Sequence, residues 1–150
     1  MPKVIFEDDE TSVYLFTNID EPNHSSKAMI RAALREYITR QPLDSCIEPI
    51  TVHWNKSDSH TYCVIACSQK RVGIDIEYMR ERSYEKLSKR WFDPIEVTDD
   101  MEIFYDIWCQ KEAYTKWKKE RLAKNIRKVV DKPMTPLKDL PDNVVGYLCI

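Results

Sequence analysis

Two short stretches of this chain concentrate residues that could bind a cation and a phosphate. In the first, Asp75 and Glu77 lie two residues apart. If residues 72–77 form a strand, these carboxylates share one face, about 6.5 Å apart at the backbone, while Ile74 and Ile76 face the core. A single hard cation or a bound water can bridge two carboxylates at that spacing. A solvated strand edge has the same pattern, so this stretch alone leaves both interpretations open.

The second stretch lies on a predicted helix, where an apolar stripe runs directly into two charged residues, Glu112 and Lys116. Glu112 would add a third oxygen ligand, and Lys116, one turn later, would direct an ammonium group toward a phosphate. Such groups position substrates and neutralise charge in phosphoryl-type transfer. The alternative is an i,i+4 ion pair where the helix leaves the core. The apolar stripe consists of Met101, Phe104, Tyr105 and Trp108.

Hydrophobic periodicity predicts the elements that must bring these stretches together. Gly73, one of only two glycines, would allow a close approach to the backbone of the acidic strand. The polar residues 55–60 are interpreted as the link of a hairpin. Thr98 or Asp99 is the candidate N-cap of the helix that carries Glu112, with Glu102 completing a capping box. We expect strands over residues 4–6, 12–18, 47–54, 61–67, 72–78 and 144–150, and helices over about 14 residues following Ser26, over 84–91 and from the cap to about residue 119.

Composition indicates one globular domain of 150 residues, with 43% hydrophobic and 32% charged residues. The five cysteines follow no zinc-type spacing, and we expect reduced thiols in a cytoplasmic protein. No apolar run is long enough to span a bilayer, and no signal segment is expected. Residues 111–128 are basic and include Trp117, which raises nucleic-acid binding as an alternative. The overall pI near 5.9 argues against a dedicated nucleic-acid binder.

The two acidic stretches together resemble the signature motifs of the 4′-phosphopantetheinyl transferase superfamily. The first is Gly73-Ile74-Asp75-Ile76-Glu77. The second begins at Trp108, 31 residues after Glu77, and runs through Lys111-Glu112-Ala113 to Lys116. The likeness is to the surfactin-activator type with a shortened N-terminal half. It implies an α+β fold of two pseudo-symmetric halves in one compact unit, approximately residues 1–70 and 71–150.

The resemblance further implies an enzyme that moves the 4′-phosphopantetheine arm of coenzyme A to a serine of an acyl or peptidyl carrier protein and releases 3′,5′-ADP. Asp75, Glu77 and Glu112 would bind Mg²⁺, and Glu112 would also act as general base. Lys116 would contact the pyrophosphate and support catalysis. The expected partners are coenzyme A and a carrier protein, for a monomer that binds neither nucleic acid nor membrane. The resemblance places coenzyme contacts at Lys27, Ser57, Asp58, His60, Lys111 and Lys116.

Several residues depart from the family pattern. Relatives read Asn-x-Ser-His-Ser before the acidic strand, whereas this chain has Asp58 where the histidine stands. An aspartate repels phosphate unless a cation lies between them. His60 could substitute, or be an ordinary surface histidine, and Lys27 belongs to a stripe with Arg31 and Arg35 that could equally be a solvated face. The alternative to a transferase is therefore a degenerate relative that binds coenzyme A or a carrier protein without transfer.

Overall fold

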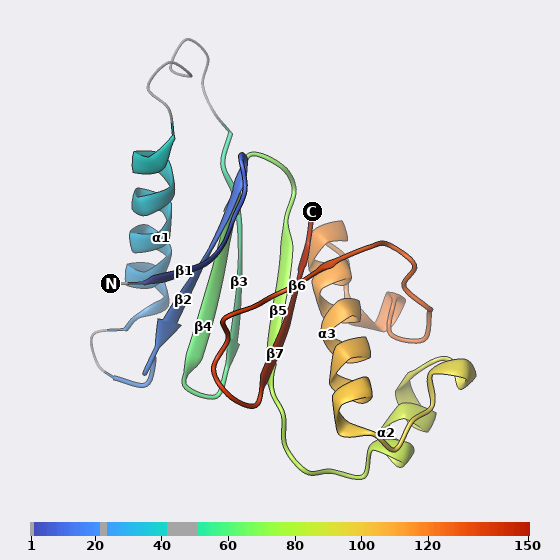
Figure 1. Ribbon diagram of the computed structural model, residues 1–150. Coiled ribbons are helices and arrows are strands. Elements are labelled where there is room, and N and C mark those ends of the chain that lie inside the picture. Colours follow the sequence, from blue (N-terminus) through green and yellow to red (C-terminus); the bar gives the residue numbers. More distant parts are fainter. Residues whose placement is uncertain (1, 22–23, 42–50) are drawn as a thin grey trace.

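Two antiparallel sheets stand side by side between two long helices in the computed structural model, which describes residues 2–21, 24–41 and 51–150 (Figure 1). The first sheet has the order β1-β2-β4-β3 and consists of β1 (Lys3–Glu7), β2 (Thr11–Thr17), β3 (His53–Ser59) and β4 (Tyr62–Ser68). The second has the order β5-β7-β6 and consists of β5 (Gly73–Tyr78), β6 (Thr135–Pro136) and β7 (Val144–Cys149). The α-helices are α1 (Ser26–Arg40), α2 (Tyr84–Trp91) and α3 (Met101–Lys118), and the short 3-10 turns are η2 (Pro94–Glu96) and η3 (Leu122–Lys124). The expected α+β class is confirmed.

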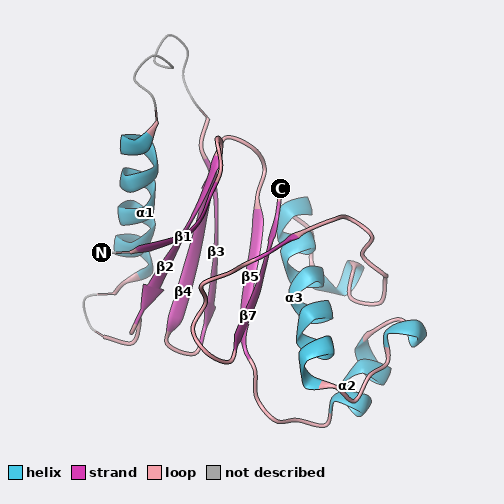
Figure 2. Cartoon of the chain, viewed as in Figure 1, coloured by secondary structure: helices cyan, strands magenta, loops and turns pink. Residues whose placement is uncertain are grey.

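The elements form four layers, with α1 and α3 on the outside and the two sheets between them (Figure 2). The helix α1 covers one face of the first sheet through Met29, Ala33 and Tyr37. Alternation along β5 directs Ile74 and Ile76 into the core between the sheets, as predicted, and Asp75 toward the opposite side. The buried core between the sheets contains Ile5, Val13, Leu15, Val64, Ala66, Val72, Ile74, Ile76 and Leu148.

Both long helices begin at side-chain caps. The α1 N-cap is Ser25, whose side chain accepts a hydrogen bond from the Ala28 amide at 3.2 Å, as its Ser-rich start predicts. For α3 the predicted cap at Thr98 or Asp99 is wrong, because the Asp100 carboxylate accepts from the Ile103 amide at 3.0 Å instead. Asp residues at neighbouring positions have similar capping propensity, so the sequence does not separate them. The helix ends at Lys118, and its C-cap Lys119 adopts a left-handed conformation (φ 57°) usually taken by glycine.

Residues 55–59 lie inside a strand rather than in a hairpin link, so this expectation was wrong. The hairpin between β3 and β4 turns at His60 and Thr61, and His60 has a positive φ of 55°. Residues 47–50 of the expected strand 47–54, and Cys46, lie outside the described residues. The polar composition of β3 concealed a strand because its side chains bind the second sheet instead of packing in an apolar core.

Hydrogen bonds from β5 to β3 side chains, here called the seam, join the two sheets. Three backbone amides of β5 donate to alternate side chains of β3: Ile74 to Asn55 Oδ1 at 2.9 Å, Ile76 to Ser57 Oγ at 3.0 Å, and Tyr78 to Ser59 Oγ at 2.8 Å. Both members of each pair advance by two residues, so the strands run parallel. The edge strand β5 thus satisfies backbone donors without a backbone ladder. The seam holds the two sheets in register beside Asp75.

The helix α3 packs against β5 and β7 at a distance that depends on Gly73. A Cβ atom at Gly73 would lie 2.1 Å from the Ala113 carbonyl oxygen and 2.5 Å from the Trp117 amide nitrogen. The missing side chain therefore brings the turn of α3 that carries Glu112 and Lys116 against the acidic strand. Within residues 2–21, 24–41 and 51–150, no helix is both long and apolar enough to cross a membrane.

Candidate active site

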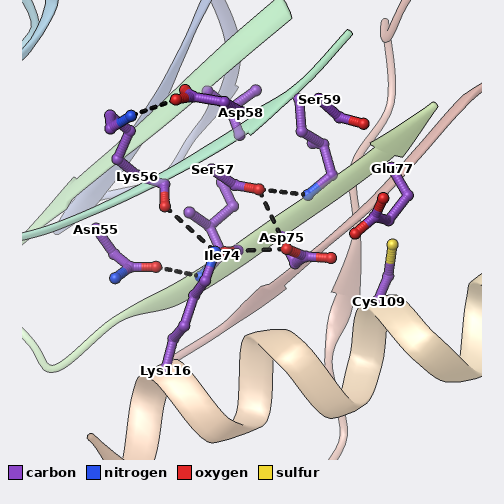
Figure 3. A network of polar contacts seen from close by, with 12 residues as sticks. Asn55, Lys56, Ser57, Asp58, Ser59, Ile74, Asp75, Glu77, Cys109 and Lys116 are labelled. Atoms are coloured by element: carbon purple, nitrogen blue, oxygen red, sulfur yellow. Dashed lines mark hydrogen bonds and ion pairs between the residues drawn. The ribbon is translucent and has the colours of Figure 1, made fainter. Parts of the chain in front are cut away.

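The centre of the site is the Asp75 carboxylate, which projects from β5 toward α3 (Figure 3). Asp75 is 4% exposed. Its Oδ1 atom accepts a hydrogen bond from the Ser57 hydroxyl at 3.1 Å and lies 3.4 Å from Lys116 Nζ. Its Oδ2 atom is buried and has no hydrogen-bond partner among the described residues. A buried carboxylate oxygen without a donor is costly, and in proteins such an oxygen is often satisfied by an ion or ordered water.

Glu77 and Glu112 share the electrostatic environment of Asp75. Burial raises the pKa of Asp75 to about 8, with Lys116 opposing the rise and both glutamates adding to it. Burial also raises the pKa of Glu77, and the charge of Glu112 raises it further. A hydrogen bond from Trp108 Nε1 to Glu77 at 3.2 Å opposes this rise. The pKa of Glu112 is raised by burial as well. The strand and the helix, distant in sequence, therefore bring three mutually repelling carboxylates together.

Lys116 contacts the backbone of both strands at the seam, β3 and β5, next to these carboxylates. Its ammonium donates to the Ile74 carbonyl oxygen at 2.9 Å and to the Lys56 carbonyl oxygen at 3.2 Å, in addition to its contact with Asp75. An ammonium group has three N–H donors, so protein acceptors occupy all of them. Lys116 can still stabilise a phosphate by charge, but direct hydrogen bonding requires it to release one acceptor, most readily the 3.4 Å contact to Asp75.

The three predicted coenzyme contacts on and after β3 lie in different surroundings. Ser57 is buried and binds Asp75 and the Ile76 amide, so it faces the carboxylates. Asp58 is exposed on the opposite face of the strand and forms an ion pair with Lys56 (Figure 3). This pairing offsets the negative charge that stands in place of the family histidine. His60 is in the hairpin turn with a positive φ, and its ring stacks on Tyr78 at a centroid distance of 4.4 Å.

Lys111 is not brought together with the other site residues. Its side chain is 1% exposed, and its ammonium binds Glu96 Oε1 at 2.8 Å and the Lys128 carbonyl oxygen. It also lies 5.2 Å from the centroid of the Phe92 ring. These contacts lock α3 to η2 and to the segment after η3, which indicates a structural role. Lys27 is exposed on the first turn of α1, so it remains a candidate coenzyme contact.

We predict that Lys111→Met lowers the free energy of unfolding by about 3 kcal/mol, because Glu96 and the Lys128 carbonyl lose a buried donor. Coenzyme A affinity, measured by calorimetry, is expected to stay unchanged. Lys118→Met is the control, since Lys118 is an exposed lysine of the same helix and its loss should change stability little. If Lys111→Met bound coenzyme A more weakly but unfolded in urea as the unmodified protein does, Lys111 would be a coenzyme contact after all.

Two hollows flank the carboxylates and differ in character. The first, of about 280 Å³, is basic and contains Lys116 together with Arg71 and Lys119. The second, of about 270 Å³, is largely aromatic and reaches Glu77. Sequence reasoning missed Arg71 and Lys119, although both lie within three residues of a motif residue. The basic hollow is further lined by Val52, His53, Trp54, Asn55 and Val72, and the aromatic one by Arg82, Leu87, Trp91, Phe104, Tyr105 and Trp108.

Trp117, in the basic segment of residues 111–128, contacts cationic and aromatic side chains of the same chain. Lys132 Nζ lies 4.3 Å from the centroid of the Trp117 ring, and Arg71 Cζ lies 5.7 Å from it. The Tyr114 ring also stacks on Trp117 at 6.1 Å. Base stacking on single-stranded nucleic acid requires an aromatic face that is accessible. The contacts of Trp117 with cations therefore give no support to the nucleic-acid alternative.

The raised pKa of Asp75 predicts the pH dependence of stability without divalent cations. Its folded pKa of about 8 exceeds the ordinary aspartate value of 3.8, so its protonated form contributes stability that is complete below the unfolded pKa. We expect the free energy of unfolding to fall as pH rises from about 5 to about 8, by up to roughly 1.4 kcal/mol per pH unit. Urea unfolding in a chelator measures this dependence. Asp75→Asn should flatten the profile, and identical profiles for the two proteins would contradict the assignment.

The oxygen donors at the site are of the kind that a hard divalent cation binds. Mg²⁺ binds carboxylate oxygens and usually retains several waters, and the partnerless Asp75 Oδ2 is an oxygen of the required kind. A cation would also relieve the repulsion among the three carboxylates. Within the described part of the chain, however, no group of three or more Asp, Glu, His or Cys side chains is arranged to hold a metal ion. The four described cysteines, Cys63, Cys67, Cys109 and Cys149, are buried free thiols.

The family model described as the 4′-phosphopantetheinyl transferase superfamily matches residues 71–137, which include both motifs. The resemblance inferred from these motifs is thereby confirmed.

Two bacterial relatives carry the same description. A 4′-phosphopantetheinyl transferase of Bacillus subtilis is 34% identical over 73 residues, covering 43% of this chain and 32% of the relative. The 4′-phosphopantetheinyl transferase Sfp of Bacillus subtilis strain 168 is 31% identical over 99 residues, covering 60% of this chain and 42% of the relative. The chain thus spans less than half the length of these relatives.

Proposed function

We propose that this protein transfers the 4′-phosphopantetheine group of coenzyme A to a serine of an acyl or peptidyl carrier protein. The observation that carries the proposal is the buried, partnerless Asp75 Oδ2 beside Glu77 and Glu112, at the two motifs of the matched superfamily. A site of this kind suits a reaction in which the protein mainly positions groups and neutralises charge.

Asp75, Glu77 and Glu112 would hold Mg²⁺, which when bound neutralises the diphosphate and activates its phosphorus toward attack. Glu112 would accept the proton from the carrier serine hydroxyl. The raised pKa of this carboxyl group favours proton acceptance near neutral pH. The serine oxygen forms a bond to the phosphorus of the phosphopantetheine, and the bond to 3′,5′-ADP breaks. Lys116 would stabilise the charge on the departing phosphate.

The two hollows support coenzyme A as the donor. The basic hollow at Arg71, Lys116 and Lys119 is suited to the phosphates of a nucleotide. The aromatic hollow at Trp108 and Glu77 is suited to a less polar group that reaches the carboxylates from the other side. The lysine and the glutamates would then lie between the two ends of the substrate.

Binding without transfer is the second candidate, and one observation favours it. All three donors of Lys116 are used by protein acceptors, and this arrangement must change before the ammonium bonds a phosphate. A protein that only holds coenzyme A or a carrier protein would not need that change.

A transfer assay separates the two candidates. The full chain is incubated with coenzyme A, Mg²⁺ and each of several apo carrier proteins, and intact mass spectrometry records the carrier. We expect the mass increase of one phosphopantetheine group and its loss when a chelator is added. Coenzyme binding by calorimetry without modification of any carrier would favour the binding protein.

A further inference from the structure

The two oxygens of the Asp75 carboxylate have different partners. Oδ1 receives both protein contacts, from the Ser57 hydroxyl at 3.1 Å and from Lys116 Nζ at 3.4 Å. Oδ2 is fully buried and receives no hydrogen bond from an N–H or O–H group of the described residues, although the Cys109 thiol lies near the carboxylate (Figure 3). The carboxylate is therefore anchored through one oxygen, which leaves the other available to a ligand.

Ser57 is oriented from both sides. Its oxygen accepts the Ile76 amide at 3.0 Å, and its single proton is then directed to Asp75 Oδ1. The side chain is buried and comes from β3, whereas Asp75 belongs to β5 (Figure 3). One hydroxyl thus joins the first sheet to the backbone and the carboxylate of the second.

We infer that Ser57 is a positioning residue, which holds Asp75 Oδ1 so that Oδ2 faces a divalent cation. This inference rests on the proposed function and assigns Ser57 to the carboxylate rather than to the coenzyme. A hydrogen bond to a metal-ligating carboxylate fixes its rotamer, and losing such a bond typically costs 10–100-fold in metal affinity. The N-terminal half therefore shapes the cation site without supplying a ligand.

The chain contains a matched control for this inference. Ser59 lies two residues later on β3 and accepts the Tyr78 amide at 2.8 Å, so it makes the same kind of seam bond. Its hydroxyl contacts no carboxylate among the described residues. Ser57→Ala and Ser59→Ala each remove one seam bond, but only the first releases Asp75.

The test measures Mn²⁺ affinity of the full chain by electron paramagnetic resonance, without coenzyme or carrier. We expect Ser57→Ala to weaken Mn²⁺ binding about 10-fold or more, Ser59→Ala to bind as the unmodified protein does, and Ser57→Thr to restore affinity. Both alanine variants should lower Tm by similar amounts. Should Ser57→Ala fail to fold, Ser57→Cys retains the side-chain size with a weaker donor and should weaken binding in the same direction.

Two results would overturn the inference: equal Mn²⁺ affinity in Ser57→Ala and the unmodified protein, or an equal loss in Ser59→Ala. Neither depends on catalysis. If Ser57→Ala alone loses affinity while no carrier is modified, the positioning role stands and the proposed transfer fails. If carriers are modified while Ser57→Ala binds Mn²⁺ normally, the transfer stands and the positioning role fails.

Discussion

Glu112→Gln is expected to reduce carrier modification by about 1,000-fold or more while leaving the fold intact. The substitution keeps the shape of the side chain but removes both a charged oxygen ligand and the candidate proton acceptor. It also removes one of the carboxylates that raise the pKa of Asp75, so the variant should be at least as stable as the unmodified protein. Single-turnover transfer measured by mass spectrometry gives the rate, and urea unfolding gives the stability.

Glu102→Gln is the control, because Glu102 is exposed in the first turn of the same helix. Its transfer rate should match that of the unmodified protein. Substantial transfer by Glu112→Gln would rule out the role of Glu112 as base and ligand. It would direct attention to Asp75 and Glu77 as the remaining carboxylates.

Gly73→Ala is expected to destabilise the protein by about 3 kcal/mol or more and to impair transfer. The new methyl group would lie 2.1 Å from the Ala113 carbonyl oxygen and 2.5 Å from the Trp117 amide nitrogen. Both contacts are with the α3 backbone, which cannot rotate away as a side chain can. The helix must move outward, and Glu112 and Lys116 move with it, away from Asp75. A displacement of about 1 Å at a reaction centre can cost 100-fold in rate.

Gly146→Ala provides the comparison on β7. Its methyl group would lie 2.7 Å from Ile76 Cγ2 and 2.9 Å from Leu137 Cδ1, which are ends of side chains. These atoms can shift, although the Asp75 carbonyl oxygen at 3.0 Å limits the adjustment. We expect a smaller loss of stability than for Gly73→Ala, measured by thermal unfolding. A Gly73→Ala protein with unchanged Tm and transfer rate would show that the close helix approach is not needed.

The sequence determined the local features of the site. Alternation along residues 73–77 separated Ile74 and Ile76 from Asp75, and helical spacing placed Glu112 and Lys116 on one stripe. These patterns are local because backbone geometry sets the direction of each side chain. The glycine in the first motif indicated a close approach, and the tertiary structure identifies α3 as the element that approaches.

Long-range contacts decided the rest. Lys111 and Lys116 are both motif lysines, yet they are five positions apart, about 140° around the helix, and only packing shows that one binds Glu96 and the other reaches Asp75. The polar residues of β3 resembled a loop because their partners are backbone amides of a strand 19 residues later. Periodicity describes which side of its own element a residue faces. It does not describe which distant element lies there, and for Ser57 that distant element is the strand carrying Asp75.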